Sequence, residues 1–149
     1  MHDYEAYPEL SNAQLAEFGF SSPHTQITED FEAVVEDVTD GDTINVTCSF
    51  RSFKFPVRFL DYDAPEMNQG GEKAKQWLSS RVLGKRVFVL IDRSNRVGKY
   101  GRLLGRVMHN GIVLAEEMFY LGLNRPFGMI DEGQLARFQK ITRLNQWFT

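Results

Sequence analysis

Two strand-like runs joined by an Asp-Gly-Asp turn constrain the fold of this chain more than any other feature. The runs FEAVVEDVTD (31–40) and TINVTCSF (43–50) are rich in Val, Ile, Thr and Phe, residue types that favour β-strands. An Asp-Gly pair between two such runs is a strong signal for a β-hairpin. The main body of the protein is therefore expected to begin as antiparallel sheet.

Further runs extend this pattern through a chain of 149 residues, which is enough for one domain with a substantial core. We expect a third strand containing Pro56, which favours a sheet edge or a bulge. The order strand-strand-strand-helix-strand-strand-helix-helix is that of a five-stranded OB-type Greek-key barrel, so the predicted class is α+β with three helices. The remaining expected strands are 54–61, 86–92 and 102–110, and the expected helices are 69–83, 113–122 and 131–148.

Residues 1–30 differ from the rest of the chain and are predicted to form an acidic N-terminal extension, separate from a domain over 31–149. The extension holds six acidic residues and no Lys or Arg. Its segment LSNAQLAEFG (10–19) predicts one short helix, because Ser11 and Gln14 can form a capping box. So short a helix is not stable alone, and we expect it to contact its own domain or a partner protein.

The charge distribution bears on the partner of the protein. The formal net charge is −3, yet residues 81–106 hold eight basic residues against the single acid Asp92. A cluster of this kind can follow a phosphate backbone, although ordinary solvated surface charge explains it as well. We also hypothesise that the acidic extension covers or tunes this basic face.

The stretch VRFLDYDAPE (57–66) carries an unusual number of charges at the end of the third expected strand. If the strand stays extended, alternation places Asp61 and Asp63 on the same face. Pro65 forces a turn that would bring Glu66 back over the strand end. Arg58 lies among apolar residues, where an unpaired charge is costly, so it needs a carboxylate or a phosphate.

Carboxylates that meet at loops favour a hard cation such as Ca²⁺. Asp42 adds one more carboxylate, in the turn at 40–42. A cation, the arginines Arg58 and Arg102, and a carboxylate that activates water are together the components of phosphodiester hydrolysis. Simple turn chemistry at 40–42 and a solvated strand end are the alternative explanations.

Five motifs, in this order and at these separations, resemble the staphylococcal nuclease (thermonuclease-like) family. The similarity runs from about residue 31 to residue 147. Each motif is common by itself, and the specificity lies in finding all of them together. The motifs are DGDT (40–43), VRFLDYDAPE (57–66), KYGRLLG (99–105), VLAEEMFYLGL (113–123) and LNQW (144–147).

The resemblance implies an OB-type barrel with three helices and a Ca²⁺-dependent nuclease that cuts DNA and RNA with little sequence preference, leaving 3′-phosphates. It also implies a role for each matching residue. Asp42, Asp63 and the carbonyl of Ala64 would bind Ca²⁺ with Asp40 in support, Arg58 and Arg102 would hold the phosphate, Glu66 would be the general base, and Lys99 and Tyr100 would contact a neighbouring phosphate.

The chain departs from the family pattern at several positions. Ala64 stands where the family often has Thr, and an acid at 61 replaces an apolar residue. The family's stacking tyrosines after the second helix are absent. Phe127 is a candidate to stack a base in their place, and Arg125 is a candidate for one more phosphate contact. The extension at 1–30 lies outside the resemblance.

These observations predict DNA or RNA as the substrate, no membrane partner and a monomer. The N-terminus shows no basic region followed by an apolar stretch, so we expect no secretory signal and, by default, an intracellular or virion setting. Two rival functions remain open. One is a non-catalytic nucleic-acid-binding or interaction module of the same fold, and the other is a structural protein that acts through its acidic extension.

Overall fold

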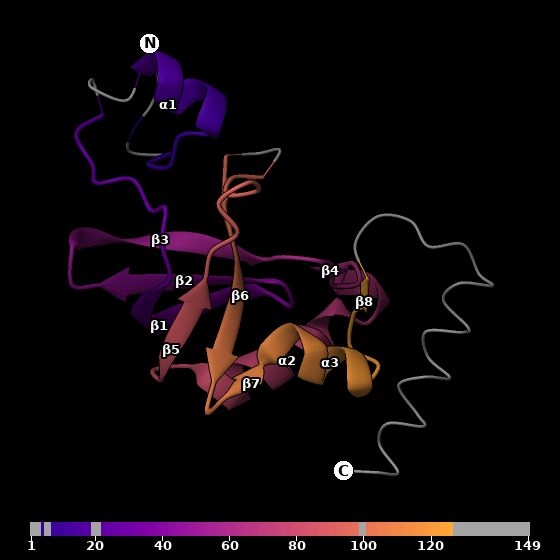
Figure 1. Ribbon diagram of the computed structural model, residues 1–149. Helices are drawn as coiled ribbons and strands as arrows, with labels where there is room; N and C mark the ends of the chain where they lie inside the picture. The colour runs from indigo at the N-terminus through magenta and orange to yellow at the C-terminus, as the bar shows by residue number, and fades with distance from the viewer. Residues whose placement is uncertain (1–3, 5–6, 19–21, 99–100, 127–149) are drawn as a thin grey trace.

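Five strands form a closed barrel in the computed structural model of the chain, which describes residues 4, 7–18, 22–98 and 101–126 (Figure 1). Hydrogen-bonded neighbours follow the order β3-β2-β1-β5-β6, and a parallel pairing between β3 and β6 closes the barrel. The predicted fold class is therefore confirmed. The barrel strands are β1 (Phe31–Asp40), β2 (Thr43–Cys48), β3 (Arg51–Phe59), β5 (Arg86–Leu90) and β6 (Leu103–His109).

Short elements and helices complete the described part of the chain. In Figure 1, α2 and α3 lie at one end of the barrel, while α1 lies at the opposite end. The helix expected over 131–148 falls outside the described residues. The remaining elements are α1 (Asn12–Phe18), β4 (Tyr62–Asp63), the 3₁₀ turn η2 (Met67–Gln69), α2 (Gly71–Val82), β7 (Ile112–Val113), α3 (Leu114–Tyr120) and β8 (Arg125–Pro126).

Local chemistry explains where several elements turn. Asn110 and Gly111 both have positive φ, of 54° and 80°, as a tight hairpin turn between β6 and β7 requires. Pro56 pairs with Asn45 of β2 and directly precedes Val57, where β3 begins to pair with β6. Pro56 therefore lies where β3 has one sheet neighbour, consistent with the expected edge position.

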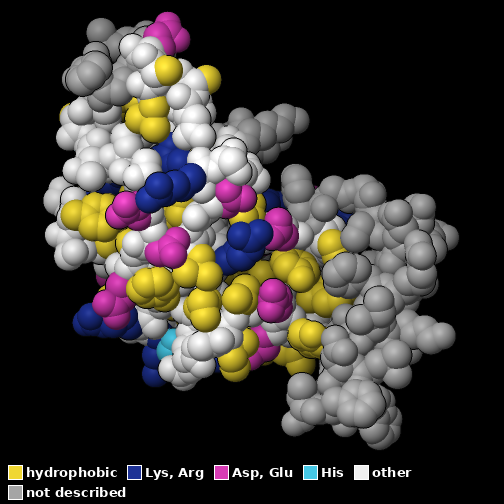
Figure 2. Space-filling view, viewed as in Figure 1, with side chains coloured by type: hydrophobic (Ala, Val, Ile, Leu, Met, Phe, Trp, Pro, Cys, Tyr) yellow, Lys and Arg dark blue, Asp and Glu magenta, His cyan; other side chains and the backbone are white. Residues whose placement is uncertain are grey.

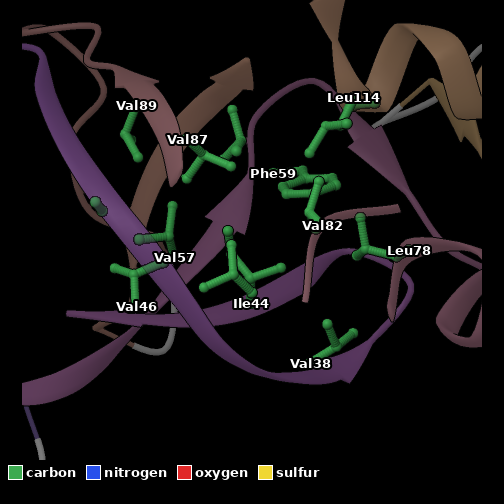
Figure 3. Packing of buried hydrophobic residues seen from close by; sticks show 14 of the residues in the cluster. Val38, Ile44, Val46, Val57, Phe59, Leu78, Val82, Val87, Val89 and Leu114 are labelled. Carbon is green, nitrogen blue, oxygen red and sulfur yellow. The ribbon is translucent and has the colours of Figure 1, made fainter. Parts of the chain in front are cut away.

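The core fills the barrel and continues beneath α2 (Figure 3). Ile44, Val57 and Val89 from three different strands are fully buried. Leu78 and Val82 of α2 are fully buried as well, because they recur on one face of the helix. The core thus fixes α2 against the barrel end where β1 turns into β2.

The chain bends sharply after β3, which separates the two acids Asp61 and Asp63 of the charged stretch at 57–66. Asp61 has a φ of +74°, so the backbone is not extended there and simple alternation fails. Asp61 forms an ion pair with Arg106, with an Oδ2–Nη2 distance of 2.6 Å, whereas Asp63 contacts Arg58. The expectation that Asp61 and Asp63 share a face depended on an extended strand, and the bend removes that condition.

The backbone at Asp61 provides a test of this bend. We expect Asp61→Ala to be less stable than Asp61→Gly by about 1 kcal/mol, because alanine pays a steric cost at positive φ that glycine avoids. Both variants lose the same ion pair with Arg106, so the difference between them isolates the backbone. Urea unfolding of the two proteins measures it. Equal stability would show that the bend relaxes to ordinary φ values.

The N-terminal extension packs on the barrel. Its helix α1 carries the predicted capping box: the Ser11 N–H donates to Gln14 Oε1 at 2.9 Å, and the Gln14 N–H donates to Ser11 Oγ at 3.2 Å. Ile27 joins the hydrophobic core cluster of the barrel. No helix among the described residues is both long and apolar enough to span a bilayer.

Candidate functional site

The turn between β1 and β2 packs directly against α2 and against the bend after β3. A Cβ atom placed on Gly41 would lie 2.6 Å from the Cβ of Ala74 and 2.9 Å from the Cβ of Ala64. Gly41 is therefore required for close packing rather than for an unusual φ. This contact places the Asp-Gly-Asp turn beside the segment that carries Asp63 and Ala64.

Replacing Gly41 by Ala is expected to cost about 1–3 kcal/mol of unfolding free energy, because overpacking a tight contact displaces its neighbours. If Asp42 binds Ca²⁺, as the family resemblance implies, the same change should weaken that binding, because Asp42 would move with the turn. Gly98→Ala is the matched control, because its nearest new contact, at 3.2 Å, is the flexible end of Leu104. Thermal unfolding with and without Ca²⁺ measures both effects, and a Gly41→Ala protein as stable as the control would contradict the packing argument.

Arg58 brings together two carboxylates, Asp42 from the turn between β1 and β2 and Asp63 from β4. Its Nη2 atom contacts Asp63 Oδ1 and also lies 3.2 Å from Asp42 Oδ2, while its Nη1 donates to the carbonyl of Phe59 at 3.3 Å. The backbone N–H of Ala64 donates to Asp42 Oδ2 at 3.1 Å. The structure thus brings Asp42, Arg58, Asp63 and Ala64 together at one place. The sequence predicted that Arg58 would need a carboxylate or a phosphate, and two carboxylates contact it.

Asp40 supports Asp42 from the same turn. The Asp42 N–H donates to Asp40 Oδ1 at 3.1 Å. Burial, together with the hydrogen bond and the negative charge of Asp42, raises the pKa of Asp40 to about 6. Burial opposes ionisation of Asp42 too, but hydrogen bonds from Asp40 and the Ala64 N–H and the charge of Arg58 outweigh it and hold the pKa of Asp42 below its usual value. Asp42 is therefore the member of the pair that ionises first as the pH rises.

Thr43 links Arg102 to this cluster, a role that the sequence did not predict. Its hydroxyl donates to Asp42 Oδ1 at 3.1 Å, and Arg102 Nη1 lies 3.4 Å from the same hydroxyl. Arg102 precedes β6, whose residue Leu104 pairs in parallel with Arg58 of β3. Arg58 on β3 and Arg102 directly before β6 therefore lie near each other at this site, and Arg102 reaches Asp42 through Thr43. The only signal in the sequence was the place of Thr43 in the DGDT motif.

Glu66 lies on the bend that follows Asp63, and its backbone is firmly held. Its carbonyl accepts the N–H groups of Gln69 at 2.8 Å and Gly71 at 2.9 Å. A Cβ on Gly71 would lie 2.3 Å from the carbonyl oxygen of Pro65, so the start of α2 is pressed against this bend. The Glu66 side chain itself is exposed, which leaves its carboxylate accessible to water.

The other predicted site residues divide into two groups. Arg125 of β8 pairs in register with Asp63 of β4, which places it beside the carboxylates. Lys99, Tyr100 and Phe127 lie outside the described residues, and their predicted contacts with substrate stay predictions.

The basic residues between 81 and 106 do not form a continuous patch over the described residues. Figure 2 shows basic and acidic side chains next to one another across the face it presents. Five of the arginines form ion pairs with acids from other elements. These pairs are Arg81–Glu117, Arg86–Glu32, Arg93–Glu29, Arg96–Glu9 and Arg106–Asp61.

The donor set fits a hard cation in its chemistry. No group of three or more His, Cys, Asp or Glu side chains arranged for metal binding occurs within the described ranges, so the protein would supply few ligands. Asp42 and Asp63 nevertheless both contact the same nitrogen of Arg58. A metal ion bound beside this guanidinium would have two carboxylate oxygens as ligands. Carboxylates, a carbonyl and water are the ligands Ca²⁺ takes.

Comparison with known proteins agrees with this geometry. The family model described as staphylococcal nuclease homologue matches residues 56–146. A protein named micrococcal nuclease, from Shigella flexneri, is 38% identical over 129 residues, covering 76% of this chain and 70% of that protein. The chain belongs to the staphylococcal nuclease family. The matched region includes six of the site residues described above, whereas the turn that carries Asp40 and Asp42 lies before it. The six are Arg58, Asp63, Ala64, Glu66, Arg102 and Arg125.

A second relative is similar to this chain over part of its own length. An uncharacterized protein of Bacillus anthracis, pXO1-141, is 35% identical over 88 residues, which cover 54% of this chain and 40% of that protein. The chain thus spans less than half of the length of this relative.

Proposed function

We propose that the protein is a nuclease that hydrolyses phosphodiester bonds of DNA and RNA in a Ca²⁺-dependent reaction, with little sequence preference, and leaves 3′-phosphate ends. The observation that carries this proposal is the meeting of Asp42 and Asp63 at one nitrogen of Arg58. Family membership and the relative named micrococcal nuclease support the same class of substrate.

The proposal gives each residue of the site a part. Asp42, Asp63 and the carbonyl of Ala64 would hold the Ca²⁺, which when bound neutralises charge on the substrate phosphate. Arg58 and Arg102 bind the phosphate oxygens and stabilise the negative charge that develops on them. The exposed carboxylate of Glu66 accepts a proton from the attacking water.

Arg125 is proposed to bind a further phosphate group along the nucleic-acid strand. It is exposed and lies beside Asp63 through the β4–β8 pairing. Guanidinium groups bind phosphates with paired hydrogen bonds, and contacts of this kind carry no base preference. Arg125 is thus suited to hold substrate without reading its sequence.

Removal of the metal tests the proposal. The wild-type protein should degrade single-stranded DNA and RNA when Ca²⁺ is present and cut neither in chelator, because the phosphate charge is then left to the arginines alone. End-labelled products of the Ca²⁺ reaction should carry 3′-phosphates. Equal cleavage in chelator would contradict the metal dependence, and 3′-hydroxyl products would contradict the proposed products.

A non-catalytic binding module is the second candidate. Its support is that Arg58 already pairs with both Asp42 and Asp63, so each of these carboxylates has a cationic partner that is part of the protein. A binder would retain labelled DNA in a gel shift and leave it intact after Ca²⁺ is added. A nuclease would shift DNA in chelator and shorten it in Ca²⁺.

A further inference from the structure

We propose that Glu9, in the N-terminal extension, is a positioning residue for Arg102, acting through Arg96 on the loop between β5 and β6. The inference rests on the proposed function, in which Arg102 binds the substrate phosphate. The extension is then a part of the catalytic architecture that lies outside the segment matched by the family model.

Glu9 is buried and fully engaged. Its side chain is 2% exposed, its Oε1 contacts Arg51 and its Oε2 lies 3.0 Å from Arg96 Nη2. The same Oε2 accepts the backbone N–H of Ile27 at 3.0 Å. A side chain of this kind is costly to bury without such partners. Glu9 therefore ties together the extension, the β3 strand and the β5–β6 loop.

Arg96 uses nearly its whole guanidinium group on the extension. Its Nε donates to the Ile27 carbonyl at 2.7 Å, and its Nη1 donates to the Leu10 carbonyl at 2.9 Å and to Asn12 Oδ1 at 3.2 Å. Arg96 is 3% exposed. A guanidinium group that is bound by this many acceptors has a fixed position. The segment of the β5–β6 loop around Arg96 is therefore fixed as well.

Two backbone hydrogen bonds carry this constraint from Arg96 to Arg102. The carbonyl of Arg96 accepts the Leu104 N–H at 2.8 Å, and the carbonyl of Arg102 accepts the Gly98 N–H at 2.8 Å. These two bonds flank Leu103, which forms an isolated antiparallel bridge with Val97, so they hold the backbone directly after Arg102 to the arm of the loop that carries Arg96. Figure 1 shows the loop rising beside the N-terminal segment, away from α2 and α3. Without Glu9, the guanidinium of Arg96 would lose its anionic partner. The loop that carries Arg96 would then be held less firmly to the extension; this attachment through Glu9 and Arg96 is called the anchor below.

Charge shielding is the competing explanation for the acidic extension. Glu29 offers the comparison, because it also pairs with an arginine of the loop, Arg93, at 3.0 Å, but both side chains are more than 70% exposed. Exposed pairs of this kind contribute little to structure. Glu29→Gln therefore removes the same charge from the same extension as Glu9→Gln without removing the anchor.

The test compares Glu9→Gln and Glu29→Gln in the full-length chain. In Glu9→Gln, the amides of Gly98 and Leu104 should exchange with deuterium at least about tenfold faster than in the wild type, while the amide of Phe59 in the barrel stays protected. The kcat/KM for single-stranded DNA should fall by about tenfold, with Ca²⁺ affinity unchanged. Glu29→Gln should match the wild type in exchange and in kcat/KM.

A double-mutant cycle separates positioning from general loss of stability. Adding Glu9→Gln to Arg102→Ala should lower kcat/KM no further, because the group that Glu9 positions is already gone. A further fall of about tenfold would show that Glu9 acts on the fold as a whole and would overturn the inference. Equal effects of Glu9→Gln and Glu29→Gln would overturn it in favour of charge shielding.

Asn12→Ala is a milder second variant should Glu9→Gln fail to fold, because it removes one acceptor of Arg96 and the hydrogen bond from Asn12 Nδ2 to the Arg93 carbonyl, at 2.9 Å. It should accelerate exchange at Gly98 and Leu104 in the same direction, and unchanged exchange would overturn the anchor. A wild-type protein that cuts no nucleic acid would refute the nuclease proposal, and the exchange data would still decide whether Glu9 anchors the loop.

Discussion

Replacing Glu66 by Gln is expected to lower the kcat for DNA cleavage by about 10²–10⁴-fold, the range for loss of a general base. The amide keeps the size of the side chain but cannot accept a proton from water. Glu66 holds its place through backbone hydrogen bonds to Gln69 and Gly71, so the substitution should leave the fold intact. Steady-state kinetics on single-stranded DNA at saturating Ca²⁺ measures the loss.

The matched control for this substitution is Glu72→Gln. Glu72 lies in the first turn of α2 and is exposed like Glu66, so the two variants change the charge of the same region equally. We expect Glu72→Gln to retain wild-type kcat and both variants to retain Ca²⁺ affinity. If Glu66→Gln cuts DNA at the wild-type rate, Glu66 is not the base. If instead it loses Ca²⁺ binding, its role is to hold the metal.

The barrel and its turns were predictable because their chemistry is local. The Asp-Gly turn, the Asn110-Gly111 turn and the capping box of Ser11 and Gln14 each depend on residues within a few positions of one another. The closing β3–β6 pairing follows from the order of the strands, which leaves a five-stranded OB barrel no other way to close. The position of Arg58 within an apolar strand also indicated that a carboxylate or a phosphate must lie nearby.

What the sequence could not predict depends on partners far apart in the chain. Alternation placed Asp61 on the same face as Asp63. The positive φ at Asp61, however, depends on tertiary context, and the alternation of residues in the sequence does not reveal it. Counting bases over 81–106 suggested one patch, while the structure pairs five of the arginines with acids. Glu9 meets Arg96 across 87 positions, a distance that no local pattern spans.

Arg58→Ala is the second substitution with a large expected effect. Cleavage should fall by about 10²–10³-fold at saturating Ca²⁺, because a preorganised donor to the developing phosphate charge is lost. In the absence of Ca²⁺ the variant should also be less stable than the wild type. Asp42 and Asp63 would remain close together with no guanidinium between them, and like charges in a partly buried site repel.

Calcium should reverse this loss of stability, and that reversal distinguishes a cation site from a purely structural cluster. Removing the positive charge of Arg58 strengthens the attraction of Asp42 and Asp63 for a metal ion, so Ca²⁺ should raise the melting temperature of Arg58→Ala by more than it raises that of the wild type. Arg106→Ala is the control, because it breaks the exposed pair with Asp61 and should leave the Ca²⁺ effect unchanged. If Ca²⁺ stabilises neither protein, the two carboxylates serve only to bind Arg58, and the nuclease proposal loses its metal. If Ca²⁺ stabilises Arg58→Ala strongly while cleavage stays low, the metal and the arginine have separate tasks at one phosphate.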